Sequence, residues 1–374
     1  MTIVIVVDCF NDKSNGTAVS ANNLAQNLES KGHIVRVVAP HINGENKFNV
    51  RERWIPLVTY IAHNQHMHFG KADKKILRDA FSGADIIHFF LPFKLEIVGV
   101  KIAKEMKIPY IGAFHLQPEH ISYNGNLRWI PKIDDLVLWL FKYRFYNAIY
   151  HIHCPSRLIS EELLKNDFKQ KLAVISNGFN ASFKPIAVPR QDDLFHIVMT
   201  GRYSKEKRQD VLIKAIKQSK YEKNIKLHLK GQGPMDNCYK KMAKDLSNEV
   251  DFGFVSKDDL AKLYSQMDIY VHTADIDGEA ISALEAIACG IVPIIADSPL
   301  SATKQFALDE RSVFKSGDSK DLAKKIDYFI EHKDELESLK TRYEKSAKDY
   351  DLSICVDKMI DFYKEAIEDF KQIY

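Results

Sequence analysis

The chain has 374 residues, of which 45% are hydrophobic and 28% are charged. This composition is typical of a soluble globular protein of about two domains and excludes a largely disordered chain. The longest apolar runs, such as residues 136–141, are far shorter than the roughly 20 residues that a membrane-spanning helix needs. Five cysteines are spread along the chain without a Cys-x-x-Cys pair, which predicts free thiols and a reducing cytoplasm.

Charge is divided unevenly between the two halves. The net charge of +3 combines +7 in residues 1–188 with −4 in residues 189–374. This asymmetry favours the interpretation that the basic half binds an anionic surface or ligand. An ordinary soluble domain is the alternative that the charge alone leaves open.

The first half alternates short apolar runs with amphipathic stretches, and it begins with an expected buried strand, not a signal peptide. Strands are expected at residues 3–7, 34–39, 86–90, 110–113, 149–154 and 172–176. Helices are expected at 17–31, 95–106 and 157–166, the last with Ser156 as its N-cap. This alternation indicates a parallel α/β sheet.

The second half repeats the pattern after a proline-containing linker at 183–195. Strands are expected at 197–200, 225–230, 250–252, 269–272 and 292–296, and helices at 209–218, 235–246 and 280–289. Residues from about 319 to 374 are expected to be helical. Two doubly wound α/β domains would face each other across a cleft at the carboxyl ends of their sheets, where ligands of such folds bind.

A basic segment, GRYSKEKR at 201–208, lies between an expected strand and an expected helix. Arg202 and Lys207 would stand at the carboxyl end of that strand. Two cations beside a helix N-terminus suit a diphosphate that no metal neutralises. A solvated surface turn is the structural alternative.

An acidic segment, ADIDGEAISALEAIACG at 274–290, follows another strand and opens a helix near Ala280 and Ile281. Glu285 inside this helix can accept hydrogen bonds from two neighbouring hydroxyls, as a ribose presents them. Asp277 and Glu279 lie in the loop, where the hydroxyls of a sugar could reach them. The alternative is that these acidic residues only favour the helix dipole.

Together, these segments resemble the donor site of the retaining glycosyltransferases of family 4, which have the GT-B fold. The resemblance implies that Arg202 and Lys207 hold a nucleotide diphosphate. It also implies two glutamates with seven residues between them, one near the donor sugar and one on the ribose. The second matches Glu285, whereas the first falls on Asp277, so the sequence departs from the pattern and Glu279 is a second candidate.

Other motifs follow in the order of the family. LKGQGP at 229–234, with Gly231, resembles the glycine turn beside the nucleotide, and the backbone at Phe254 and Val255 resembles the part that meets the base. Asn15, Gly16 and Thr17 resemble the glycine loop beside the donor phosphates, and VISNGFNASFKP at 174–185 resembles the end of the N-terminal domain.

His115, in GAFHLQPEH at 112–120, follows an expected strand of the first half and resembles the active-site histidine that contacts the transferred sugar. A histidine at the carboxyl end of a strand can donate a hydrogen bond to a hydroxyl or a backbone oxygen. A histidine with a purely structural role is the alternative.

The resemblance implies a division into residues 1–188, which bind the acceptor, residues 189–352, which bind the nucleotide sugar, and a helix at 353–374 that packs back on the first domain. It implies a UDP-sugar donor, transfer with retention of anomeric configuration, and no bound metal or cofactor. Nothing predicts a nucleic-acid partner. A non-catalytic sugar-nucleotide or glycan-binding module and a sugar-nucleotide epimerase of the same fold are the alternatives.

Two patterns suggest a metal. His63, His66 and His68 stand close together in HNQHMH, but no acidic triad accompanies them in the sequence, so we expect an ordered or acceptor-facing loop. Asp275 and Asp277 match the Asp-x-Asp of metal-dependent glycosyltransferases of another fold, but they lie in the second domain beside a helix. No phosphate-binding loop of an ATPase or dinucleotide fingerprint follows the first strand.

Residues 128–146 mix basic residues with aromatic and aliphatic ones, which suits the headgroup boundary of a membrane. Together with the basic first half, this segment predicts a lipid-linked or membrane-proximal glycan acceptor and peripheral docking on the cytoplasmic leaflet. The alternatives are a buried core helix at 136–141 and a soluble acceptor.

Overall fold

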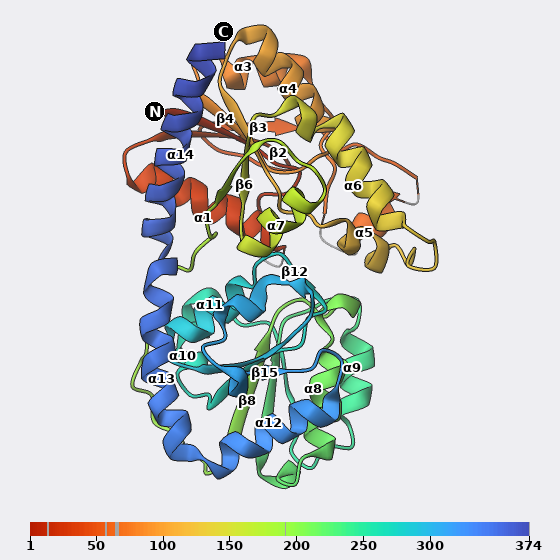
Figure 1. Cartoon of the computed structure of the whole chain (residues 1–374), viewed down its shortest axis with the longest axis vertical. Helices are drawn as coiled ribbons and strands as arrows, with labels where there is room; N and C mark the ends of the chain where they lie inside the picture. The colour runs from red at the N-terminus through yellow and green to blue at the C-terminus, as the bar shows by residue number, and fades with distance from the viewer. Residues whose placement is uncertain (13–14, 57, 64–66, 191, 374) are drawn as a thin grey trace. The chain divides into compact units, whose positions relative to one another are not determined.

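The computed structural model describes residues 1–12, 15–56, 58–63, 67–190 and 192–373 (Figure 1). The chain forms two compact units, Met1–Asn177 with Leu352–Tyr374 (unit 1) and Gly178–Asp351 (unit 2). The division therefore falls ahead of the expected boundary after residue 188. The reason is that Phe179 and Phe183 are buried in the core of unit 2, where Phe179 also forms a β-bridge with Asp351.

Unit 1 contains a parallel sheet in the order β3-β2-β1-β4-β5-β6-β7. Its strands are β1 (Thr2–Val6), β2 (Ile34–Pro40), β3 (Lys47–Val50), β4 (Ile86–Phe89), β5 (Tyr110–Ala113), β6 (His151–Cys154) and β7 (Lys171–Val174). β1 lies between β2 and β4, so the strand order reverses beside it. In such sheets, ligands bind at the carboxyl ends of the strands next to this reversal.

Helices cover both faces of this sheet. They are α1 (Gly16–Ser30), α2 (Val58–His63), α3 (Lys74–Phe81), α4 (Lys94–Met106), α5 (Pro118–Asn124), α6 (Ile133–Arg144), α7 (Arg157–Lys165) and α14 (Leu352–Ile373). Side chains alternate along β1, so Ile3 and Ile5 pack with α1 and α14, whereas Val4 and Val6 pack with α3 and α4. Because helices cover both faces of the sheet, its strands are buried and form nearly continuous apolar runs.

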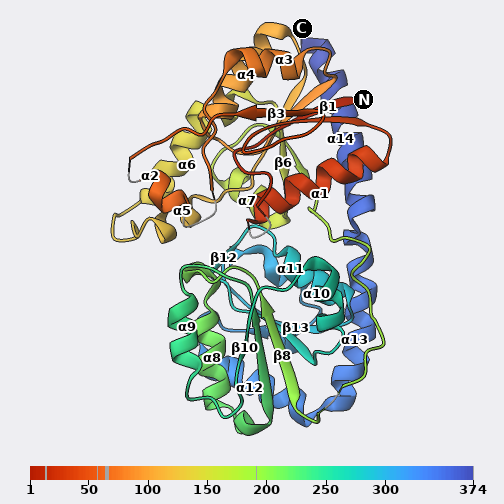
Figure 2. The same ribbon diagram turned by 180° about the vertical axis from the view of Figure 1, so that it is seen from behind.

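The C-terminal helix α14 belongs to unit 1 and packs beside α1 (Figure 2). Val356, Met359 and Tyr363 of its apolar face are buried in the same core as Leu24 and Leu28 of α1. Polar contacts add to this packing, since the Tyr363 hydroxyl lies 2.9 Å from Nδ1 of the buried His88 on β4. Residues 353–373 thus pack on the unit that the first half of the chain forms.

Unit 2 contains a second parallel sheet in the order β10-β9-β8-β11-β13-β15. Its strands are β8 (Phe195–Thr200), β9 (Ile225–Lys230), β10 (Asp251–Gly253), β11 (Ile269–His272), β13 (Val292–Ala296) and β15 (Val313–Phe314); β12 (Ile276–Asp277) and β14 (Leu300–Ser301) pair separately. The helices are α8 (Gln209–Gln218), α9 (Asp236–Ala243), α10 (Lys257–Tyr264), α11 (Ile281–Ala288), α12 (Ser319–Glu331) and α13 (Lys333–Ala347). The strand order reverses between β8 and β11, which is where the basic and acidic segments begin.

Candidate active site

The basic loop at 201–208 leaves the carboxyl end of β8 and is held by the next strand of the sheet. The Thr273 hydroxyl, directly after β11, lies 2.8 Å from the carbonyl oxygens of both Lys207 and Arg208. Arg208 has a left-handed backbone with φ 56°, which turns the chain into α8. These contacts fix the loop that carries both predicted phosphate-binding cations against the end of the neighbouring strand.

Lys207 makes a buried ion pair with one of the predicted sugar-binding carboxylates. Its Nζ donates to Oδ2 of Asp277 over 2.5 Å, and Nε2 of the buried His272 lies 3.2 Å from the same oxygen. Burial alone would raise the pKa of Asp277, but Lys207 and His272 hold it well below its usual range. Asp277 is therefore ionised at neutral pH and already paired.

Arg202 is fixed by its own loop. Its backbone carbonyl accepts a hydrogen bond from Nε2 of Gln209 over 2.8 Å, and its guanidinium lies 3.7 Å from the carboxylate of Glu206. Glu206 is fully buried and accepts a hydrogen bond from the Ser204 hydroxyl over 2.8 Å. The structure thus brings Arg202 and Lys207 onto one rigid loop, as a diphosphate site requires.

The start of α11 offers a second feature that suits an anion. The N-cap residue, Ala280, makes no side-chain cap, and the N–H groups of Ile281 and Ala283 donate to the carbonyls of Glu279 and Ala280 over 3.1 and 3.0 Å. The dipole of the helix is therefore the feature that suits an anion here. Glu279 precedes the cap and is half-buried. Ile281 begins the helix, so Ala280 and Ile281, both predicted to bind the donor, lie at its N-terminus.

Glu285 lies on the buried side of α11. Burial raises the pKa of its carboxyl to about 7, against the opposing influence of Lys257. A carboxyl group with such a raised pKa can lose its proton, or can accept hydrogen bonds, when a polar ligand binds. This environment is compatible with the ribose role predicted for Glu285, which stays a prediction.

The glycine turn of 229–234 packs backbone against backbone on the basic loop. Gly201 donates to the carbonyl of Lys230 over 2.9 Å, and Tyr203 donates to the carbonyl of Gln232 over 3.1 Å. A Cβ atom on Gly231, whose φ is 158°, would lie 1.9 Å from the carbonyl oxygen of Gly201. Glycine is required here because no side chain fits between the two loops.

The segment predicted to meet the base follows β10 at the same edge of the sheet. Gly253 at the end of β10 accepts a hydrogen bond from the backbone of Gly231 over 2.9 Å. The Phe254 side chain that follows is 55% exposed, and Val255 is half-buried. The structure therefore places the glycine turn and the base segment next to each other.

In unit 1, His115 follows β5 and is packed between two rings. Its ring stacks on Phe90 with centroids 5.0 Å apart and meets His153 edge-on at 5.2 Å. Burial, with a smaller contribution from His153, holds the pKa of His115 well below its usual range, so the imidazole is neutral. Its buried Nε2 has no hydrogen-bond partner among the described residues, which leaves it available to a ligand.

The predicted loop of Asn15, Gly16 and Thr17 opens α1. Oδ1 of Asn15 accepts hydrogen bonds from the N–H groups of Thr17 and Ala18 over 3.0 and 3.2 Å. Gly16 is exposed, and a Cβ atom there would meet nothing within 4 Å. The fold itself therefore does not require glycine at position 16.

Sequence reasoning missed several residues that organise the donor loops. Arg208 donates to Asp275 over 2.9 Å, and the Ser316 hydroxyl lies 3.2 Å from the other oxygen of the same carboxylate. Both aspartates of the Asp-x-Asp pattern are thus paired with cations of the basic loop. The position of His272 at the end of an expected strand was the available signal for its contact with Asp277.

Comparisons with known proteins identify the family of the chain. The family model "Glycosyltransferase Family 4" matches residues 14–183, and the model "Glycosyl transferases group 1" matches residues 183–349. An alpha-monoglucosyldiacylglycerol synthase of Streptococcus pneumoniae is 27% identical over 321 residues, which cover 79% of this chain and 71% of that protein.

Two solved structures are also similar. The Anabaena protein HepE in complex with UDP and glucose has a TM-score of 0.73 and 16% identity over 98% of this chain and 100% of that chain. The catalytic domain of cholesterol-alpha-glucosyltransferase from Helicobacter pylori is 51% identical, covers 42% of this chain and 98% of that chain, and has a TM-score of 0.41. With both family models matched in order, the chain belongs to the family 4 glycosyltransferases of the GT-B fold and is a hexosyltransferase.

Proposed function

We propose that the protein transfers a sugar from a UDP-linked donor to the hydroxyl group of a membrane lipid, with retention of anomeric configuration. Two similar proteins support this choice, because one is a monoglucosyldiacylglycerol synthase and the other was solved with UDP and glucose. The observation in this chain that carries the acceptor half of the proposal is one exposed face of α6.

The α6 face consists of four large side chains spaced at three- and four-residue intervals, so they share one side of the helix: Leu136, Trp139, Leu140 and Tyr143. Trp139 is 56% exposed and Tyr143 is 68% exposed, and their rings stack with centroids 5.5 Å apart. Leu138 and Phe141, on the opposite side, are buried in the core of unit 1. The alternative of a helix buried all round is therefore wrong.

Exposed basic residues lie near the α6 face. Arg128 and Lys132 precede the helix, and Arg144 ends it. Trp129, which lies between the first two, is 78% exposed. Aromatic rings with basic neighbours suit the headgroup boundary, where each Lys or Arg contributes about 1 kcal/mol near an anionic surface.

The described part of the chain contains no helix with both the length and the apolar character that crossing a bilayer requires.

The donor half of the proposal rests on the fixed charges of unit 2. In the proposed reaction, the bond between the anomeric carbon and the leaving phosphate oxygen breaks. The acceptor oxygen bonds to that carbon on the same face, and its proton passes to the phosphate oxygen. Arg202, Lys207 and the N-terminus of α11 would stabilise the charge that develops on the leaving diphosphate.

Two further assignments complete the proposed site. Since Asp277 is paired with Lys207 and His272, we assign the hydroxyls of the donor sugar to Glu279. Both Asp-x-Asp carboxylates face cations, which supports chemistry that uses no metal at this site. Neutral His115 would donate or accept a hydrogen bond at the transferred sugar.

The test supplies purified protein with UDP-glucose, UDP-galactose, UDP-N-acetylglucosamine or GDP-mannose and with vesicles that contain diacylglycerol, a sterol or no hydroxyl lipid. We expect release of UDP that depends on a hydroxyl lipid, and a glycolipid whose anomeric proton coupling shows the configuration of the donor. Release without acceptor, release of GDP only, or an inverted product would each contradict a stated part of the proposal. Conversion of the donor without any acceptor would indicate an epimerase.

A further inference from the structure

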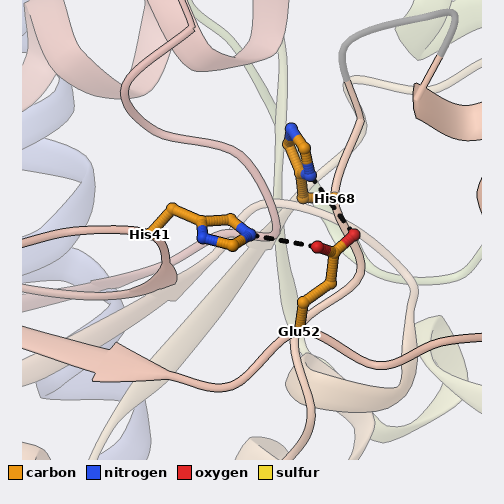
Figure 3. Close-up of side chains that lie close together, drawn as sticks. All are labelled: His41, Glu52 and His68. Atoms are coloured by element: carbon orange, nitrogen blue, oxygen red, sulfur yellow. Dashed lines mark hydrogen bonds and ion pairs between the residues drawn. The ribbon is translucent and has the colours of Figure 1, made fainter.

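Three histidines surround one glutamate at the edge of unit 1, and this His/Glu cluster plays no part in the donor chemistry. It consists of His41, Glu52, His63 and His68; Figure 3 shows His41, Glu52 and His68. Nε2 of His41 lies 3.0 Å from Oε2 of Glu52, and Nδ1 of His68 lies 3.2 Å from Oε1. Nε2 of His63 lies 2.5 Å from the same Oε1. His66, predicted in the same motif, lies outside the described residues.

The cluster is assembled from segments that are distant in sequence. His41 follows β2, Glu52 follows β3, and His63 ends α2. His41 has a left-handed backbone with φ 56°, which is uncommon for a side chain other than glycine. The sequence pattern therefore showed only closely spaced histidines, whereas the fold adds His41 and the missing carboxylate.

The backbone beneath the cluster is held by contacts of its own. Glu52 and Gly70 form an antiparallel bridge, flanked by hydrogen bonds of 2.7 Å from Arg53 to Phe69 and from Lys71 to Arg51. Gly70 also donates to the buried Asp8 over 2.5 Å. Glu52 and His68 are thus positioned by main-chain pairing, so the loop does not need the side-chain cluster in order to form.

The spacing of the ligand atoms fits one metal ion. The nitrogen and oxygen atoms that His41, Glu52 and His68 offer all lie within 4.8 Å of one another. Zinc bonds of about 2.0 Å in a tetrahedron separate neighbouring ligand atoms by roughly 3.3 Å. The distances of 3.0 and 3.2 Å join the two histidines to different oxygens of Glu52, so seating one ion requires side-chain rotations that turn all three groups toward a common point.

The donor set also selects the class of metal. Imidazole nitrogens with one carboxylate are typical ligands of zinc and its neighbours in the first transition row, whereas magnesium and calcium prefer oxygen alone. The four side chains are between 21% and 59% exposed, so an ion can enter from solvent.

We propose that His41, Glu52 and His68, with His63 beside them, form a binding site for a zinc-class divalent ion. The site lies at the carboxyl ends of β2 and β3, the same edge of the sheet at which β5 delivers His115. A bound ion would join the loop after β2 to the segment that carries α2. Because the site contains none of the predicted donor residues, it stands independently of the proposed function.

Another histidine cluster provides the matched control. In unit 2, His196 lies 2.9 Å from His228, which lies 2.8 Å from Asp251. In this chain of contacts His228 stands between the other two, so the three groups do not surround one point. Among the described residues, three or more His, Cys, Asp or Glu ligand atoms converge only at His41, Glu52 and His68.

The experiment uses tag-free full-length protein and titrates it with zinc by calorimetry. We compare the wild type with His41→Ala/His68→Ala, with the conservative Glu52→Gln and with the control His196→Ala. We expect one zinc per chain in the wild type and the control, at least tenfold weaker binding in the other two variants, and no displacement of zinc by magnesium. Equal zinc affinity in the wild type and the double variant would overturn the proposal.

A second readout does not depend on the folding of the double variant. Cobalt bound to the wild type is expected to give the visible absorption of a tetrahedral site, and zinc is expected to raise the melting temperature of the wild type but not of Glu52→Gln. A spectrum of cobalt in water only, or an equal shift in both proteins, would refute the site. Neither readout requires glycosyl transfer.

Discussion

The two units treat charge in opposite ways at the edges that carry their predicted site residues. In unit 2, Lys207 and Arg208 are paired with Asp277 and Asp275, so the edge holds fixed ionised groups. In unit 1, His88, His115 and His153 are buried and neutral, and burial lowers the pKa of His153 to about 4. The edge of unit 2 suits a diphosphate that gains charge, whereas that of unit 1 suits an uncharged hydroxyl.

Two buried carboxyl groups of unit 1, Asp8 and Glu96, differ from Asp277 of unit 2 in the direction of their pKa shifts. Burial raises the pKa of Asp8 in unit 1 to about 6, although Glu96 and the Gly70 N–H act in the opposite direction. Burial and Asp8 raise the pKa of Glu96 well above its usual range. Asp277 in unit 2 shows the reverse shift because cationic neighbours outweigh its burial. The difference predicts which substitutions impair catalysis and which alter stability.

The largest effect is expected at the donor cations. Lys207→Ala and Arg202→Ala should each lower kcat by about a hundred- to a thousandfold, since a lost donor in a closed site costs roughly 2.7–4 kcal/mol in the transition state. The matched control is Lys205→Ala, an exposed lysine of the same loop. Steady-state release of UDP measures kcat for all three variants. A near-wild-type kcat in Lys207→Ala would show that the difference in charge between the two units does not matter for catalysis.

The next effect concerns the two predicted glycine loops. Gly231→Ala should destabilise the protein by about 3 kcal/mol or more, because the new Cβ overlaps the Gly201 carbonyl in a strained backbone. Gly16→Ala should change the free energy of unfolding by less than about 0.5 kcal/mol, since the added carbon meets only solvent.

Urea unfolding of both glycine variants measures this difference. A weaker donor affinity in Gly16→Ala at unchanged stability would support its predicted phosphate role. Equal stability of the two variants would show that the loops of the two units do not differ in packing.

A smaller effect is expected from the proton on Asp8. Between about pH 4 and 6, the folded state keeps a proton that the unfolded chain releases, so wild-type stability should fall as pH rises. The shift corresponds to about 2–3 kcal/mol. Asp8→Asn should flatten this dependence while its side-chain oxygen still accepts from Gly70.

The measurement is the urea midpoint at pH 4, 5, 6 and 7 for the wild type and Asp8→Asn. Asp73→Asn is the control, because Asp73 is exposed and caps α3 through the backbone N–H groups of Lys75 and Ile76. Identical pH profiles for the wild type and Asp8→Asn would exclude a proton that the folded state keeps on Asp8.

The smallest effect on the fold is expected at the α6 face. Trp139→Ala/Tyr143→Ala should leave the free energy of unfolding within about 0.5 kcal/mol of the wild type, because both rings are largely exposed. Binding to anionic vesicles should weaken about tenfold by cosedimentation. The control, Phe254→Ala, removes an exposed ring from unit 2 and should leave vesicle binding unchanged. Loss of binding in both variants would contradict docking through unit 1 alone.

Much of the fold could be predicted because its strands are apolar runs bounded by turns. The expected strands 110–113, 225–230 and 269–272 coincide with β5, β9 and β11. The short β3 was not predicted, because KFNV at 47–50 alternates polar and apolar residues over only four positions. β12 and β14 were also missed, because two-residue strands are defined by their pairing and not by a sequence pattern.

In the candidate site too, local sequence patterns could be predicted, whereas contacts between distant loops could not. The residue types at positions 202, 207 and 285 could be matched to a family pattern, because the motifs are contiguous, whereas Asp277 departs from that pattern. The contact of Lys207 with Asp277 and the gathering of His41 with Glu52 and His68 could not, because each joins loops that only the strand order brings together. Exposure of Trp139 depends likewise on which side of α6 meets the core.

The return of α14 to unit 1 has a consequence for the order in which the chain is made. The strands and α1 of unit 1 leave the ribosome first, but the helix that packs beside Leu24 and Leu28 is synthesised only after all of unit 2. Until residues 352–373 emerge, this face of the first sheet lacks part of its apolar cover. A nascent chain therefore presents a surface that chaperones recognise, and unit 2 can finish folding before unit 1 does.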